Sequence, residues 1–182
     1  MATVQAWIPQ AISIAAMAFQ IISFQFKKNK TYLILQGTGG LLFAISFFLM
    51  GTGGYASALI NLIGVFKSFT FASPNNKKLF RRNYMYLFIA LYIVATVCIT
   101  IVTKQFDWLS YVILFAQITG TVAIWTDSAR IIRIAQLSII SPAWLLNNSI
   151  HFSIGGILCH IFMVVSIIIS VVRYGWDGLD KK

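Results

Sequence analysis

Two polar side chains, Asn61 and His160, stand inside long apolar runs of the sequence. Burying a polar group without a partner is costly, so each of them must find a hydrogen bond. A small polar solute held between helices would supply one, and a neighbouring helix would supply one equally well. The sequence therefore predicts a solute site at Asn61 and His160, with interhelical hydrogen bonding as the alternative.

A second group of residues follows Pro142, where an apolar run approaches its end. Proline removes a backbone donor and disturbs a helix, so we predict a hinge at Pro142. The hinge would turn Trp144 and Asn147 toward a cavity, where the indole stacks on a small polar solute and the amide binds it. The alternative is that Trp144 belongs to an interfacial aromatic belt and Asn147 begins a loop.

Two glutamines, Gln36 and Gln136, lie early in two apolar runs that are 100 residues apart. Glutamine commonly joins helices through hydrogen bonds in an apolar environment. We predict that the pair acts either as a gate or as a clamp between helices.

Acidic groups are too scarce for most catalytic chemistry, because the chain has four Asp and no Glu. The two cysteines, Cys98 and Cys159, are far apart and lie in separate apolar runs. General acid–base catalysis and metal binding need several His, Cys, Asp or Glu side chains that converge. We therefore expect no enzyme activity, no catalytic residue, no metal site and no cofactor.

The elements that carry these residues are apolar enough for a lipid bilayer. Of the 182 residues, 59% are hydrophobic and 10% are charged, whereas soluble domains have about 45–50% and about 25%. A membrane-spanning helix needs about 20 residues. We predict one all-α membrane domain, 1–182, with seven spans at 7–26, 31–50, 54–72, 84–103, 108–126, 131–148 and 150–173.

The positive charge predicts how these spans are oriented. The formal net charge is +10, and the cations cluster after the first, third, fifth and seventh spans, with Lys67 and Lys104 as the exceptions. By the positive-inside rule the N-terminus is outside and the C-terminus is cytoplasmic. Membrane orientation explains this charge better than nucleic acid does, so the lipid bilayer is the predicted partner and nucleic acid is not.

The pattern of polar residues repeats along the chain. Residues 7–72 match residues 108–173 at an offset of 100, falling to 99 in the last span, which pairs Asn61 with His160 and Gln36 with Gln136. The span 84–103 has no counterpart and is predicted to be a linker helix. Because three spans and a linker make an even number, the two three-helix repeats are parallel, related by an axis along the membrane normal.

Four short segments carry a family resemblance: FFLMG at 47–51, ASALIN at 56–61, WLLNN at 144–148 and SIGG at 153–156. With them the chain resembles the YgjV family of bacterial inner-membrane proteins over nearly its whole length. The arrangement of three, one and three helices looks like the SWEET and PQ-loop superfamily of small transporters. The resemblance implies a multi-pass protein of the bacterial inner membrane.

Together these features favour a SWEET-like carrier or facilitator with a site between the two repeats. We expect no charged side chain at mid-depth, so the predicted solute is small, polar and uncharged. The alternative is a non-transporting structural or interaction protein on the same fold. One chain contains both repeats, which is compatible with a monomer or a homodimer.

Overall fold

The computed structural model describes residues 2–49, 55–73, 78–103, 108–150 and 154–180, and every regular element within them is a helix. The first four helices are α1 (Ala2–Ser23), α2 (Asn29–Leu49), α3 (Tyr55–Ala72) and α4 (Lys78–Thr103). After α5 (Trp108–Trp125), three consecutive segments form one continuous helical rod: α6 (Ala129–Ala135), the π-helical turn η2 (Gln136–Ile140) and α7 (Ser141–Ile150). We call it the α6–α7 rod. The last helix is α8 (Ile154–Tyr174).

Five of these helical stretches are long and apolar enough to cross a membrane: α2, α4, α5, the α6–α7 rod and α8. Two shorter apolar stretches, Trp7–Ser23 and Ala58–Ala72, lie in α1 and α3. The expectation of an all-α protein with several membrane spans is therefore confirmed. The predicted bounds agree with the helices to within a few residues, except that α1 begins at Ala2 rather than at residue 7 and α4 begins at Lys78 rather than at residue 84.

Large apolar side chains cover the outside of the bundle. Val102 and Val172 are each 81% exposed, and Phe48, Phe66 and Ile101 are more than half exposed. Exposed apolar surface on this scale is unfavourable in water and is expected where lipid surrounds a helical bundle. The exposed surface thus agrees with the membrane assignment.

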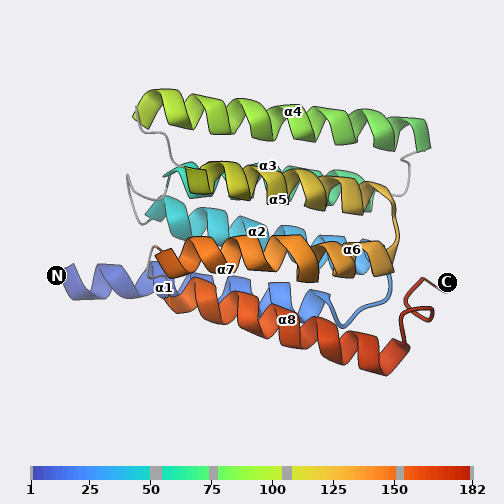
Figure 1. Cartoon of the computed structure of the whole chain (residues 1–182). Coiled ribbons are helices and arrows are strands. Elements are labelled where there is room, and N and C mark those ends of the chain that lie inside the picture. The colour runs from blue at the N-terminus through green and yellow to red at the C-terminus, as the bar shows by residue number, and fades with distance from the viewer. Residues whose placement is uncertain (1, 50–54, 74–77, 104–107, 151–153, 181–182) are drawn as a thin grey trace.

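Helix α4 lies along one edge of the bundle (Figure 1), and the contacts among the other helices form two groups, which we call the two sets. In one set α2 packs against both α1 and α3, and in the other the α6–α7 rod packs against both α5 and α8. The sets meet where α1 packs against α8 and where α3 packs against α5. Helix α4 packs against α3 and α5.

The two termini lie at opposite ends of the bundle, and the α1–α2 and α5–α6 connections lie at the same end as the C-terminus (Figure 1). We call this the C-terminal end. Much of the buried core gathers toward it, from the ends of α1, α3 and α5 and from the starts of α2, α4 and α6. Its members there include Phe24, Tyr32, Leu33, Phe71, Ala72, Met85, Phe88, Ala123, Ile124, Ile132 and Ala135.

A fully buried arginine lies within this core. Arg133 on α6 is only 1% exposed, although its charge had suggested a residue at the membrane surface. Its guanidinium donates to the backbone oxygens of Phe24 at 2.9 Å and Phe26 at 3.0 Å, just after the end of α1. It also donates to Ser170 Oγ on α8 at 3.2 Å and to the Ala129 oxygen in its own helix at 3.1 Å.

These bonds explain why a charge is tolerated there. The last carbonyl groups of a helix have no partner within the helix and carry its negative dipole end. Arg133 binds two carbonyls of the segment just beyond α1, next to that negative end of the helix, and at the same time it joins α6 to α8. The Arg133 side chain therefore links α6 by hydrogen bonds to α8 and to the segment after α1, at the C-terminal end.

We predict that Arg133→Met lowers the free energy of unfolding by about 3 kcal/mol, because it leaves buried acceptors without donors. The measurement is chemical unfolding of the purified protein in mixed micelles. The matched control is Arg130→Met, one turn away, whose half-exposed side chain pairs with Asp177 at 3.5 Å. An exposed pair contributes up to about 1 kcal/mol, so equal losses in the two variants would contradict the assigned role of Arg133.

Candidate functional site

Two of the predicted site residues lie against each other. Trp144 on α7 and His160 on α8 stack with their ring planes 6° apart and their centroids 6.0 Å apart. The packing of α7 against α8 makes this contact possible, although the two residues are far apart in sequence. The stack presents a flat aromatic pair on the second set of helices.

The imidazole of His160 has an unused nitrogen. Its Nδ1 atom is buried and makes no hydrogen bond to the residues that the structure describes. Buried polar atoms in proteins are nearly always paired, with protein, water or ligand. An unpaired nitrogen beside an aromatic stack is the combination that a small polar ligand uses, with one polar contact and one flat apolar contact.

The other two residues of the predicted site are not brought to this stack by the contacts that the structure gives. Asn61 is half-buried on α3 and has an interaction of its own, and α3 packs against α2, α4 and α5. Asn147 belongs to α7, but its side chain lies outside the described residues. Of the four predicted solute contacts, the described contacts bring together Trp144 and His160.

The helix does not break at Pro142, because the α6–α7 rod accommodates the proline with a wide turn. The Ser141 N–H bonds to the oxygen of Gln136, five residues earlier, at the end of η2. Pro142 follows immediately as the second residue of α7. Such π-helical turns relieve the clash of a proline with the preceding turn and often occur at functional sites. The hinge at Pro142 remains a prediction.

The two glutamines have different partners. Gln36 Nε2 on α2 donates to Ser23 Oγ at 2.7 Å and to the Gln20 oxygen at 3.4 Å, so it joins α2 to α1. Gln136 is buried, and its Nε2 donates to Ser141 Oγ at 3.0 Å within the same rod. Gln36 thus bridges two helices, whereas Gln136 spans the π-helical turn.

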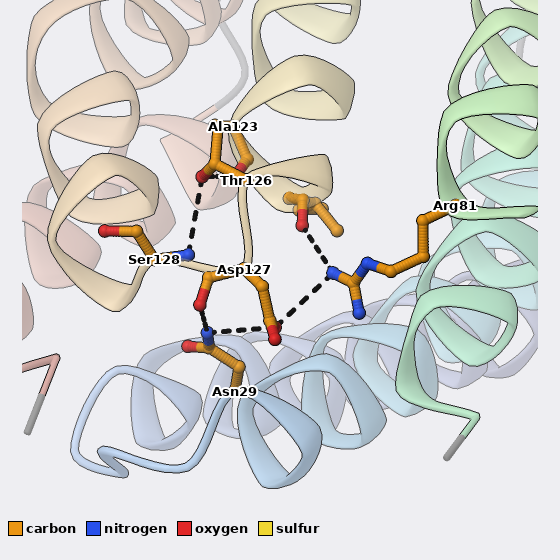
Figure 2. A network of polar contacts seen from close by, with 7 residues as sticks. Asn29, Arg81, Ala123, Thr126, Asp127 and Ser128 are labelled. Carbon is orange, nitrogen blue, oxygen red and sulfur yellow. Dashed lines mark hydrogen bonds and ion pairs between the residues drawn. The ribbon is translucent and has the colours of Figure 1, made fainter. Parts of the chain in front are cut away.

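A network of polar contacts lies at the C-terminal end, between segments of the two sets of helices and α4 (Figure 2). Asn29, at the start of α2, donates its side-chain amide to the backbone oxygen and the carboxylate of Asp127 in the α5–α6 connection. Arg81 on α4 pairs with the same carboxylate at 3.4 Å and donates to the Ile124 oxygen at 3.0 Å. Asp127 therefore connects three segments that are distant in sequence.

The backbone of Asp127 favours this residue type as well. Its φ is +59°, and it is the only residue other than glycine with a positive φ in the described part of the chain. Asp and Asn adopt this left-handed conformation more easily than other side chains do, because their short polar groups bond locally. Both the backbone conformation of this turn and its side-chain contacts therefore favour an aspartate at position 127.

The comparison with protein families identifies the chain. A family model described as a bacterial inner membrane protein, Imp-YgjV, matches residues 7–177. The chain belongs to the Imp-YgjV family. No curated protein and no solved structure gives a significant match. The family assignment and the five helices suited to crossing a membrane place this protein in the bacterial inner membrane as a multi-pass protein.

One functional candidate in this Imp-YgjV protein was missed from the sequence. Lys67 on α3 is only 6% exposed, and among the described residues its Nζ bonds only to Thr121 Oγ1 of α5, at 3.4 Å. In the sequence, Lys67 stands out only as an exception to the charge pattern. Its position between α3 and α5, which depends on packing, is what makes it a candidate site residue.

The same structure gives no indication of a metal centre in the described residues. Within these segments, no group of three His, Cys, Asp or Glu side chains lies close enough together to hold a metal ion.

We predict that three substitutions of Asp127 separate its backbone role from its contacts. Asp127→Asn keeps the positive φ accessible and loses only a half-exposed ion pair, which costs up to about 1 kcal/mol. Asp127→Gly loses the side chain but not the conformation. Asp127→Ala also loses the side-chain contacts, and its Cβ atom makes the left-handed conformation unfavourable, so this variant should be less stable than the glycine variant by about 1 kcal/mol. Chemical unfolding in mixed micelles measures the order, and an alanine variant as stable as the glycine variant would exclude the backbone contribution.

Proposed function

We propose that this protein is a carrier or facilitator for a small polar solute, built from two parallel three-helix repeats around a site between them. The first repeat is α1 to α3, the second is α5 to α8, and α4 is the linker. The superfamily that this arrangement resembles, SWEET and PQ-loop, is part of the proposal. The single observation that carries the function is the Trp144/His160 stack with its unpaired buried nitrogen.

The order of helix packing supports the repeats. In both sets the middle helix packs against the other two, and the first helix of each set packs against the third helix of the other. A twofold axis along the bundle would produce both pairs of contacts, α1 with α8 and α3 with α5. Parallel repeats related by an axis along the membrane normal have this symmetry.

Two polar contacts support the repeats at the level of single residues. Lys67 on α3 donates to Thr121 on α5, and Ser166 on α8 donates to the backbone oxygen of Ile21 on α1 at 2.7 Å. Positions 67 and 166 differ by 99, and positions 21 and 121 differ by 100. These are the offsets that relate the two halves of the sequence, so equivalent positions make equivalent contacts.

The distribution of charge supports a cytoplasmic C-terminal end. Lys27 and Lys28 lie in the α1–α2 connection, Arg130 begins α6, and Arg173 lies in the last turn of α8. These positions lie toward the end of the bundle that carries the C-terminus (Figure 1). By the positive-inside rule this end faces the cytoplasm and the N-terminus lies outside.

The contacts between the proposed repeats support a conformation that is closed at this end. Gln25 Nε2 donates to Ser166 Oγ at 2.7 Å, Asn29 binds Asp127, and Arg133 binds Phe24. Each of these contacts joins one repeat to the other near the C-terminal end. We therefore place solute entry at the opposite end, and release on the cytoplasmic side requires these contacts to separate.

The charge of the solute is left open. The expectation of an uncharged solute depended on the absence of buried cations, and Lys67 and Arg133 are both buried. Arg133 is occupied by backbone and side-chain acceptors. The proposal is therefore a small polar solute, with neutral and anionic compounds both included in the test.

We predict that uptake by the purified protein in liposomes falls about tenfold in His160→Ala, since the loss of one good solute hydrogen bond is worth about 1.4 kcal/mol. Trp144→Ala should also reduce uptake, because it removes the stacking partner of His160. The assay compares a panel of sugars, amino acids and small carboxylates against empty liposomes.

Two controls make the transport result interpretable. His151→Ala changes the chain's other histidine and should leave uptake at the level of the original protein. Size-exclusion profiles in detergent show whether each variant is folded. If no solute enters faster than into empty liposomes, the non-transporting alternative is favoured, and unchanged uptake in His160→Ala and Trp144→Ala would remove the stack from the mechanism.

A further inference from the structure

We propose that Lys67, Tyr92 and Thr121 form a binding site for a small monovalent anion between α3, α4 and α5. The site is made by other helices than those of the Trp144/His160 stack and does not depend on transport. The ligand would be a halide or a small carboxylate, two anions that offer the same acceptor chemistry to an ammonium group.

The first argument is the environment of the Lys67 ammonium group. The side chain is 6% exposed, and its Nζ lies 5.0 Å from the centroid of the Tyr92 ring on α4. Within the described residues, none of the Asp carboxylates forms an ion pair with it; the ion pairs there use Asp127 and Asp177. Burying an ammonium ion is costly unless an opposite charge compensates it. A bound anion would supply the negative charge that the described residues do not provide.

The second argument is the number of unused hydrogen-bond donors. An ammonium group has three N–H donors, and Lys67 uses one, in a long bond of 3.4 Å to Thr121 Oγ1. The Thr121 hydroxyl already donates to the Gln117 oxygen at 2.7 Å, so it can only accept from Lys67. Two ammonium donors thus have no acceptor among the described residues and remain for a ligand that accepts.

The third argument is the hydroxyl group of Tyr92. The residue is 1% exposed, and its Oη makes no hydrogen bond to any described residue. This oxygen lies against Gly64, where a Cβ atom would be 3.4 Å from it, one turn of α3 before Lys67. A phenolic O–H and an ammonium group on facing helices are both donors, and an anion between them would accept from both.

At the equivalent position in the proposed second repeat, the polar side chain has hydrogen-bond partners and carries no charge. Ser166 corresponds to Lys67, and its hydroxyl donates to the Ile21 oxygen and accepts from Gln25 Nε2. That contact is neutral and has no unused charged donor. The charge at Lys67 is therefore not a requirement of the helix packing, and this favours a role in binding.

The test is the apparent melting temperature of the purified protein in detergent with gluconate as the background anion. Chloride and bromide form one arm, and formate and acetate form the other. A ligand that binds only the folded protein stabilises it at concentrations well above Kd, and we expect a rise of about 5 °C in one arm. Stabilisation by the halides alone assigns an inorganic ion, and stabilisation by the carboxylates alone assigns a carboxylate ligand.

Substitutions test whether the anion-dependent rise in melting temperature comes from this site. Lys67→Met, which keeps an unbranched side chain one atom shorter and without the charge, should abolish the anion-dependent rise. The control Lys28→Met changes an exposed lysine and should retain the rise. Tyr92→Phe should reduce the rise, and it provides the readout if the Lys67 variant does not fold. Equal anion responses in the original protein, Lys67→Met and Tyr92→Phe would overturn the proposal, and so would the absence of any anion response in the original protein.

Discussion

The burial of Arg133 is the constraint on which the C-terminal end of the bundle depends. A guanidinium group keeps its charge in a protein, so the residues around Arg133 must supply hydrogen-bond acceptors. The supply comes from the carbonyls just beyond α1, from Ser170 on α8 and from Ala129 on α6. The Phe24 and Phe26 carbonyls lie just beyond α1 and gain a donor that the helix itself does not provide. Positioning of α1, α6 and α8 is thus coupled to one side chain.

Lys67 and Arg133 are both buried cations, but the hydrogen-bond acceptors around them differ. Arg133 spreads its charge over a planar group with several donors, and four protein acceptors face it. Lys67 concentrates its charge on one nitrogen, which faces one hydroxyl oxygen and the face of an aromatic ring. The first arrangement uses four of the five guanidinium N–H donors and stabilises the structure. The second leaves two of three ammonium donors without an acceptor among the described residues, which is why a ligand is proposed for it.

The two sets of helices differ in their polar contacts. Gln36 joins α2 to α1, whereas Gln136 spans a π-helical turn within one rod. The difference follows from Pro142, which follows the second glutamine and has no equivalent after the first. The aromatic stack likewise forms in only one of the two sets, where Trp144 meets His160.

The sequence by itself determined the helices and their class, because apolar length is a local property and the bilayer demands it of every span. The stretches 108–126 and 131–148 could be recognised from composition alone and match α5 and the α6–α7 rod closely. The importance of His160 and Trp144 could also be suspected from their types. Their contact, the burial of Arg133 and Lys67, and the bridge at Asp127 were decided only by the tertiary structure. Each of these depends on which faces of distant helices meet, and a cation near the end of an apolar run has the same sequence pattern whether it lies at the surface or in the core.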